Sequence, residues 1–226
     1  MKWLLNLFNS SIGQKLIMSL TGLFLCSFLL IHLIGNLQLL YADGGKAFNS
    51  YAYFMTNNIL IKTVSWGLYA MILLHAIKGI LMALNNRKAG GGNRYAVSSN
   101  ENASWTSKNM AILGSWVFIF IGIHMAQFWG QMKFNSEMAM VTIDGVQVKE
   151  LYGIVAAAYE NPLIVVFYVV SMFMIGAHLW HGFGSAFQSL GIRHNKYTPI
   201  IETVGKVYSV LIPGAFAIIP IWMYFN

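Results

Sequence analysis

The chain has 226 residues, of which 57% are hydrophobic and 9% carry a charge, and its mean hydropathy is +0.60. Soluble domains are typically about 25% charged, so this composition excludes an ordinary soluble protein and indicates an integral membrane protein. The formal net charge of +7 does not indicate nucleic-acid binding in so apolar a chain, and we relate it to membrane orientation instead. The one cysteine, Cys26, lies in an apolar run, which excludes an intramolecular disulfide bond.

Five apolar runs are long enough to be transmembrane helices, because about 20 helical residues cross the roughly 30 Å hydrocarbon core of a bilayer. Glycines and prolines within these runs are compatible with that prediction, since neighbouring helices can satisfy the backbone groups they free. We therefore expect an all-α integral membrane protein, a single membrane domain over 1–226 with five transmembrane helices. The expected spans are 16–40, 59–84, 109–131, 163–188 and 204–225.

Lysine and arginine gather in the N-terminal segment and in the second and fourth connections between spans. The positive-inside rule assigns such segments to the cytoplasm, so we expect the N-terminus inside and the C-terminus outside. The residues that carry this prediction are Lys2, Lys15, Arg87, Lys88, Arg94, Lys108, Arg193, Lys196 and Lys206.

Two connections carry local signals of their own. In the outer connection 132–162, "VTIDGVQV" has Asp-Gly between alternating apolar residues, which predicts a β-hairpin. The following "VKELYGIVAAAY" predicts an amphipathic helix lying on the surface. In the inner connection, "AGGGN" at 89–93 is typical of a flexible segment.

Each of the first four spans carries at least one histidine, and the fifth carries none. A helix rises about 1.5 Å per residue, which places the histidines of spans one and three near the outer face and those of spans two and four near the inner face. His32 is thereby matched with His124, and His75 with His178. The two levels are separated by on the order of 15 Å.

Two imidazoles from facing helices at one level can hold one haem, and helix bundles place cofactors between facing helices. We therefore predict that the first four helices form a haem-binding bundle with two haem b groups, whose iron ligands are His32, His124, His75 and His178. Interhelical hydrogen bonding is the alternative for a single intramembrane histidine, but it does not predict one histidine per helix at matched depths. Zinc is disfavoured because no Cys, Asp or Glu lies at these depths to complete a tetrahedral site.

Four glycines are placed where a wide porphyrin would need missing side chains. Gly79 and Gly182 each follow an inner histidine by four residues, on the same helix face. Gly22 and Gly114 each precede an outer histidine by ten residues, which puts them near the level of the inner pair. Close packing of helices is their other interpretation.

The fourth span has a second histidine, His181, three residues after His178. We assign His178 as the ligand, because its depth and its glycine match those of His75. His181 is expected to make a polar contact near the haem edge or the interface. Lys78, three residues after His75, either meets a haem propionate or extends to the interface.

Six segments in chain order carry a resemblance to a known family. They are "SLTG" at 19–22, "LLIHLIGN" at 29–36, "KAFNSYAYFM" at 46–55, "LLHAIKGI" at 73–80, "IGIHMAQFW" at 121–129 and "HLWHGFGSAFQSLG" at 178–191. The chain resembles the single-subunit, five-helix, di-haem cytochrome b of succinate dehydrogenase and fumarate reductase complexes. In that family the first and third helices hold one haem and the second and fourth hold the other, and Ser19 stands at a position that can contact a propionate.

The resemblance implies a multi-pass anchor in a bacterial cytoplasmic (inner) membrane that carries electrons within the tricarboxylic acid cycle and respiratory chain, and has no catalytic residues of its own. A flavoprotein subunit with FAD and an iron–sulfur subunit with its clusters would dock on the cytoplasmic face. Electrons would pass between them and a membrane quinone, for which menaquinone is the expectation. Candidate quinone contacts near the outer level are Asn36, Gln38 and Gln127, which are otherwise interfacial polar residues.

One position departs from part of the family. Some fumarate reductases carry a glutamate two residues before the fourth-helix histidine, as part of a proposed proton path, and here that position is Gly176. The resemblance therefore carries over no such path. Two other functions stay open: the cytochrome b anchor of another dehydrogenase, such as a hydrogenase or formate dehydrogenase, and a haem-free transporter or scaffold.

Overall fold

The computed structural model describes residues 10–89 and 104–226. Within these residues, five helical segments are long and apolar enough to cross a membrane, and each overlaps one of the expected spans. The prediction of an all-α integral membrane protein is thus confirmed. The segments are α2 (Ser11–Asn36) with the 3-10 turn η1 (Leu37–Leu40), α4 (Ile59–Ala89), α6 (Met110–His124) with η2 (Met125–Gly130) and α7 (Gln131–Phe134), α9 (Pro162–Ser189) and α10 (Thr198–Phe225).

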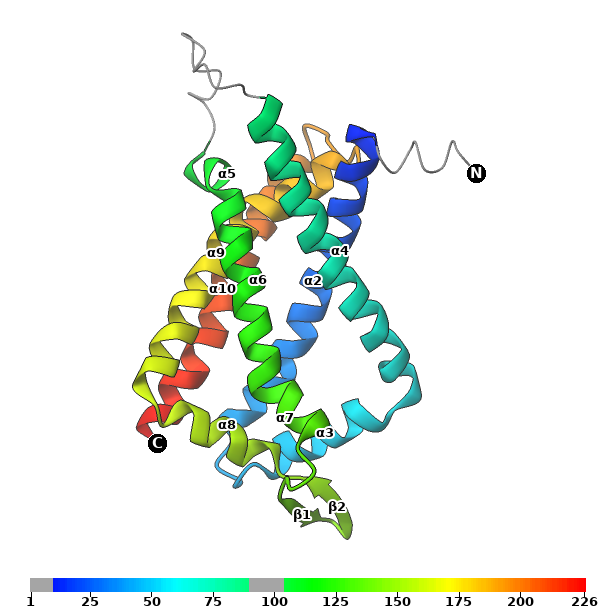
Figure 1. Cartoon of the computed structure of the whole chain (residues 1–226). Helices are drawn as coiled ribbons and strands as arrows, with labels where there is room; N and C mark the ends of the chain where they lie inside the picture. Colours follow the sequence, from blue (N-terminus) through cyan, green and yellow to red (C-terminus); the bar gives the residue numbers. More distant parts are fainter. Residues whose placement is uncertain (1–9, 90–103) are drawn as a thin grey trace.

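The five segments run alternately up and down through one bundle (Figure 1). α2, α6 and α10 begin at one end, where α4 and α9 finish. We call it the basic end, because the described cations there include Lys15, Arg87, Lys88, Lys108, Arg193 and Lys196. Lys2, Arg94 and the glycine-rich stretch after Ala89, which the sequence analysis also used, lie outside the described residues.

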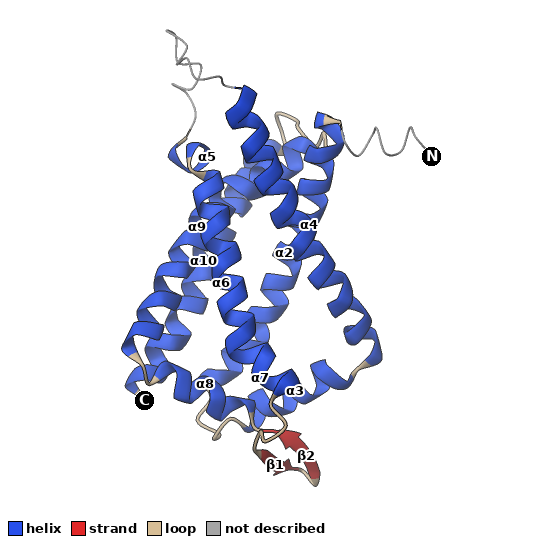
Figure 2. Cartoon of the chain, in the orientation of Figure 1, coloured by secondary structure: helices blue, strands red, loops and turns tan. Residues whose placement is uncertain are grey.

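The opposite end, which we call the hairpin end, carries the C-terminus and the elements that do not cross the bundle (Figures 1 and 2). These are α3 (Lys46–Asn57), β1 (Met140–Ile143), β2 (Val146–Lys149) and α8 (Leu151–Tyr159). A one-turn helix, α5 (Trp105–Lys108), precedes α6 at the basic end. The predicted β-hairpin and the helix predicted after it are both present, although Val155 and Tyr159 of that helix are buried, whereas no pattern in the sequence predicted α3.

The hairpin follows from its turn residues. β1 and β2 pair in antiparallel register, with Ile143 opposite Val146. The two residues between them, Asp144 and Gly145, have φ of 50° and 82°. Positive φ at both central positions is the type I′ geometry that Asp-Gly favours and that matches the twist of the strands.

Asn49 of α3 ties the hairpin end together. It is 2% exposed, and its Oδ1 accepts from the backbone N–H groups of Leu151 and Tyr152 at 3.0 and 2.9 Å. Its Nδ2 donates to Glu150 at 3.0 Å. The first N–H groups of a helix lack partners within the helix, so Asn49 satisfies the start of α8 from another element. The "AFNS" segment of the family resemblance thus has a structural task here.

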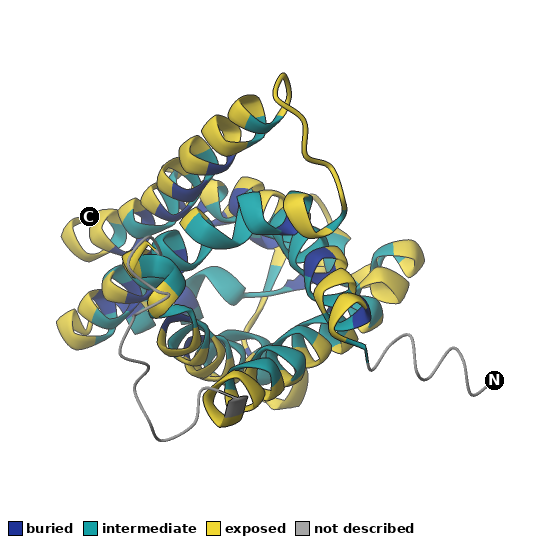
Figure 3. Ribbon diagram, turned by 90° about the horizontal axis from the view of Figure 1, so that it is seen from above, coloured by how far each residue is buried: buried dark blue, intermediate teal, exposed yellow. Residues whose placement is uncertain are grey.

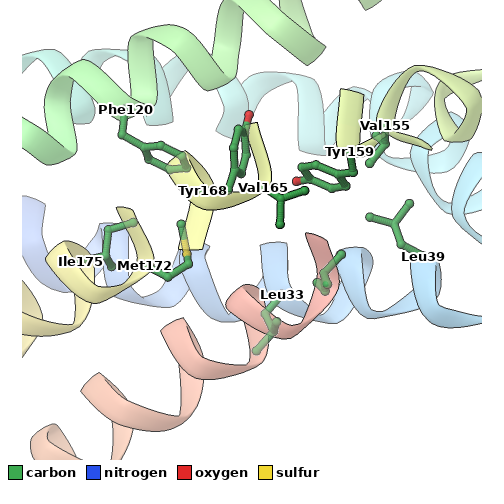
Figure 4. Close-up of a cluster of buried hydrophobic side chains, with 10 residues drawn as sticks. Leu33, Leu39, Phe120, Val155, Tyr159, Val165, Tyr168, Met172 and Ile175 are labelled. Atoms are coloured by element: carbon green, nitrogen blue, oxygen red, sulfur yellow. The ribbon is translucent and has the colours of Figure 1, made fainter. Parts of the chain in front are cut away.

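The polar and apolar residues are arranged as membrane burial requires. Exposed residues, many of them large and apolar, face outward around the bundle, and buried or partly buried ones face inward (Figure 3). Outward apolar side chains on spanning helices are in contact with lipid. A cluster of buried apolar residues, including Leu33, Phe120, Tyr168 and Met172, joins α2, α6, α9 and α10 (Figure 4).

Candidate functional site

The four histidines predicted to be haem ligands, one on each of the first four spanning helices, lie in two pairs inside the bundle. The rings of His32 on α2 and His124 on α6 have centroids 5.8 Å apart and planes inclined at 82°. The rings of His75 on α4 and His178 on α9 have centroids 6.3 Å apart and planes inclined at 70°. These are the pairs that the depth estimate from the sequence predicts. We call them the outer pair, towards the hairpin end, and the inner pair, towards the basic end.

Two glycines show that the pairs lie at different levels. A Cβ atom on Gly22 would stand 3.3 Å from Cε1 of His75, and one on Gly114 would stand 3.5 Å from Cε1 of His178. Each glycine precedes an outer-pair histidine by ten residues on its own helix. Since ten helical residues span about 15 Å, the two pairs are separated by that order of distance along the bundle.

The helices that carry the outer pair therefore also shape the inner one. Gly22 of α2 and Gly114 of α6 leave the space in which the inner rings lie. Gly79 and Gly182, four residues after the inner histidines, face the tips of Met18 on α2 and Met110 on α6, at 3.6 and 3.9 Å from a built Cβ. Small residues at and next to the inner pair thus admit side chains from the facing helix, as close helix packing in membranes requires.

An internal correspondence relates α2 to α6 and α4 to α9. A methionine, a glycine, a phenylalanine and a histidine recur at identical spacing on the first two helices, and a histidine is followed by a glycine four residues later on the other two. The corresponding sets are Met18, Gly22, Phe28 and His32 with Met110, Gly114, Phe120 and His124, and His75 and Gly79 with His178 and Gly182. Phe28 stacks on His32 and Phe120 stacks on His124, with centroids 5.2 and 5.7 Å apart.

The outer pair lies among aromatic rings. Phe216 of α10 packs against His32 at 5.6 Å, and Phe128 and Tyr168 flank His124 at 5.4 and 6.0 Å. Nearby, burial raises the pKa of the Tyr159 hydroxyl of α8, whose ring packs 5.3 Å from that of Tyr168. The immediate neighbours of this pair are therefore largely aromatic.

The polar contacts of the histidines differ within each pair. Nδ1 of His75 lies 2.9 Å from Oγ1 of Thr21, and Nδ1 of His124 lies 3.3 Å from the hydroxyl of Tyr168. The Asn36 amide nitrogen, on the next turn of His32's own helix, lies 3.3 Å from Nδ1 and 3.4 Å from Nε2 of that ring. Nδ1 of His178 is buried and has no hydrogen-bond partner among the described residues.

Two kinds of occupant, a bare metal ion and a haem, make different demands on the side chains of a pair. Among the described residues, no group of three or more His, Cys, Asp or Glu side chains could hold a metal ion. A bare zinc ion needs about four such ligands, so neither pair fits it. Haem iron takes four donors from the porphyrin and needs from the protein only axial ligands, for which histidine is a common choice. A pair of facing imidazoles supplies two.

Two further observations fit haem. In the described part of the chain, no hydrogen bond joins the two rings of either pair, so the pairs do not act as hydrogen-bonded links between helices. The second is that Nδ1 of His178 is buried without a hydrogen-bond partner among the described residues, which is rare in folded proteins, so this ring is not held as a hydrogen-bonding residue and can serve as a ligand through Nε2. The residues present are therefore compatible with one haem at each pair.

His181 is placed apart from the inner pair. The ring of His75 faces His178, whereas His181 lines a pocket of about 260 Å³ at the basic end, whose polar and apolar lining includes Trp180, Arg193 and Lys206. Its Nε2 lies 3.2 Å from the hydroxyl of Ser185. The arrangement favours His178 as the paired histidine and His181 as an interfacial polar residue.

Among the remaining residues singled out from the sequence, Asn36 contacts the ring of His32, and the described residues show no hydrogen bond between a paired ring and Ser19, Lys78 or Gln38. Ser19 is buried, and its hydroxyl donates to the carbonyl of Lys15 at 2.8 Å. Lys78 forms no hydrogen bond or ion pair with the described residues and is half-buried one turn after His75. Gln38 lies in η1 at the hairpin end.

Gly176 faces α10 rather than the interior of the four histidine helices. A Cβ there would stand 2.9 Å from the carbonyl oxygen of Ser209 and 3.9 Å from the ring of Pro213. A side chain at this position would push against the backbone of α10. The absence of a glutamate here is thus accompanied by close packing of α9 on α10.

Three features of the site were not anticipated from the sequence. Thr21 lies in the same "SLTG" segment as Ser19, and its position relative to the histidines gives no sign that it contacts one of them. Tyr168 reaches His124 from α9. Its partner Gln127 lies in η2, a π-helical segment directly after His124; such single-turn π segments often occur at functional sites.

Comparison of the chain with protein-family models, curated proteins and solved structures found no match, so its own geometry carries the interpretation.

Proposed function

We propose that this chain is the membrane anchor and electron carrier of a succinate:quinone oxidoreductase, the class that includes succinate dehydrogenase and fumarate reductase. The observation that carries the proposal is the arrangement of four intramembrane histidines as two facing pairs about 15 Å apart along the bundle. Histidines that only form hydrogen bonds between helices would not need to be arranged in this way, whereas the binding of two b-type haems would require it.

The residues have distinct tasks in this proposal. His32 and His124 would hold the outer haem, and His75 and His178 the inner one. Haem iron with two imidazole ligands has no open coordination position, which suits it to one-electron transfer rather than oxygen chemistry. The protein positions the imidazoles and excludes water with the aromatic and aliphatic side chains around them. Gly22 and Gly114 have no side chains that would occupy the space beside the rings of His75 and His178.

The basic end and the hairpin end of the bundle would have different partners. We place the basic end in the cytoplasm, in accordance with the positive-inside rule, and dock the iron–sulfur and FAD-containing subunits there, nearest the inner pair. The quinone, menaquinone by expectation, would bind in the membrane towards the hairpin end, near the outer pair. Since Gly176 packs against α10, the proposal includes no proton path through that position.

The decisive experiment is purification of the full complex from its native membrane in mild detergent. A pyridine haemochrome assay should give two b-type haems per chain, and a reduced-minus-oxidised spectrum should show them. The copurifying subunits should carry FAD and iron–sulfur clusters, and the complex should transfer electrons between succinate and a quinone. One haem or none would contradict the two-site proposal, and a haem-free preparation would favour a transporter or scaffold.

The copurifying subunits also separate the nearest alternative. An anchor of a hydrogenase or formate dehydrogenase would use the same histidine pairs. Its complex would contain nickel or molybdenum in place of protein-bound flavin, and it would show no succinate activity.

A further inference from the structure

One histidine in each pair is held by a hydroxyl group from a different helix. Thr21 of α2 contacts His75 of α4, and Tyr168 of α9 contacts His124 of α6. Each site is thus supported by one of the helices that carry the other pair. The hydrogen-bond partners of these two hydroxyls determine which way their protons point.

The proton of Thr21 is already committed. Its hydroxyl donates to carbonyl groups one turn earlier on α2, that of Ile17 at 2.7 Å and that of Met18 at 3.2 Å. A hydroxyl has one proton and two acceptor lone pairs, so towards His75 it can only accept. We therefore assign the hydrogen to Nδ1 of His75, which leaves the lone pair of Nε2 free.

The same argument holds for the outer pair. Tyr168 donates its proton to Oε1 of Gln127 at 2.7 Å, so it accepts from Nδ1–H of His124. A hydroxyl that donates to an amide oxygen becomes a better acceptor, because hydrogen bonds in a chain polarise one another. Gln127, Tyr168 and His124 thus form a short hydrogen-bonded chain that ends on Nδ1 of the imidazole.

We propose that Thr21 and Tyr168 are positioning residues, each of which fixes the Nδ1–H tautomer of one histidine and thereby presents Nε2 to a haem iron and sets the strength of that ligand. The inference rests on the proposed function. Histidines that bind metals generally donate their second ring N–H to a nearby oxygen, which fixes the ring and raises its basicity. A more basic imidazole stabilises ferric over ferrous iron and lowers the midpoint potential.

The other member of each pair lacks such a hydroxyl. By the correspondence between α2 and α6, the position equivalent to Thr21 is Leu113, which is 1% exposed. A leucine offers no acceptor to His178, whose Nδ1 has no partner among the described residues. Each site accordingly combines one oriented histidine with one that no hydroxyl from another helix orients.

The test uses the intact complex and one isosteric variant per site. Thr21→Val should raise the midpoint potential of the inner haem, and Tyr168→Phe should raise that of the outer haem. Both potentials are measured by optical redox titration, and the haem content of the complex should stay constant. The electron paramagnetic resonance signal of the affected ferric haem should shift as well. Thr21→Ser keeps the hydroxyl and should restore the original potential.

Matched controls remove a hydroxyl that touches no histidine. Ser27→Ala lies on the same helix as Thr21, and its hydroxyl donates to Phe24. Tyr208→Phe removes a hydroxyl that donates to the carbonyl of Cys26. Both controls should leave the two potentials unchanged. Unchanged potentials in Thr21→Val and Tyr168→Phe, with two haems retained, would overturn this inference alone. A parent complex without haem would overturn the proposed function and this inference with it.

Discussion

Gly22 of α2 lies directly against His75 of α4: a Cβ atom on the glycine would stand 3.3 Å from Cε1 of the imidazole. That distance is shorter than ordinary van der Waals contact, so any side chain at 22 must displace the ring. The contact joins a helix of the outer pair to a ring of the inner pair, and it fixes how near the two helices approach at the inner level.

Gly22→Val should therefore disturb one site selectively. The two γ-methyl groups would displace the ring of His75 from its place beside His178, and we expect haem content to fall from two to one per chain while the outer haem's spectrum persists. Gly122→Val is the matched control, because nothing lies within 4 Å of a Cβ at that position. Loss of both haems, or of neither, in Gly22→Val would contradict the assignment of this glycine to the inner site.

The two histidines of the fourth spanning helix should respond differently to substitution. His178→Ala removes a ring that faces His75, so we expect the inner haem to be lost. His181→Ala removes a ring that lines the pocket at the basic end, so both haems should remain. Haem content by pyridine haemochrome, compared between the two variants, checks this. The reverse pattern would make His181 the ligand.

Asn49 should matter for stability and not for haem binding. Asn49→Ala would leave the first N–H groups of α8 and the Glu150 side chain without their buried partner. Unsatisfied buried groups cost about 1–3 kcal/mol each, so we expect a lower thermal unfolding midpoint in detergent with two haems still bound before unfolding. Asn57→Ala, which removes an exposed amide on the same helix that donates to Tyr53, should change the midpoint little.

Much of the fold follows from sequence because membrane burial imposes strong constraints. Apolar run length predicts the spans, and equal rise per residue predicts which histidines meet, since helices that cross one bilayer share a common set of levels. The Asp144-Gly145 turn was predictable because few residue pairs accept positive φ twice in succession. In each case a local pattern has one physical consequence.

The unpredicted parts depend on contacts between distant elements. α3 is short, and Asn49 joins it to α8 about 100 positions later in the chain, as the separation of its hydrogen-bond partners shows. The π-helical segment η2 and the reach of Tyr168 to His124 depend on how α6 and α9 pack. Thr21 is one of several hydroxyl residues on α2, and only its orientation towards His75 distinguishes it from Ser27.

The correspondence between α2 and α6 can be tested by introducing on α6 the hydroxyl that Thr21 provides on α2. Leu113 occupies the position on α6 that Thr21 occupies on α2, one residue before the glycine that contacts an inner histidine. In Leu113→Thr, the new hydroxyl would donate to the carbonyl of Asn109, one turn earlier, and accept from Nδ1 of His178. The inner haem would then have two oriented ligands.

We expect Leu113→Thr to lower the inner haem's midpoint potential and to leave the outer one unchanged. A hydrogen bond whose strength differs by about 1 kcal/mol between oxidation states corresponds to roughly 40 mV for a one-electron couple. The lost leucine packing would cost on the order of 2 kcal/mol of stability, so Leu113→Val serves as the control that loses packing without gaining a hydroxyl. Equal potentials in Leu113→Thr and Leu113→Val would show that position 113 does not reach His178. In the double variant Thr21→Val, Leu113→Thr, the two shifts should oppose each other, because each hydroxyl acts on a different ligand of the same iron.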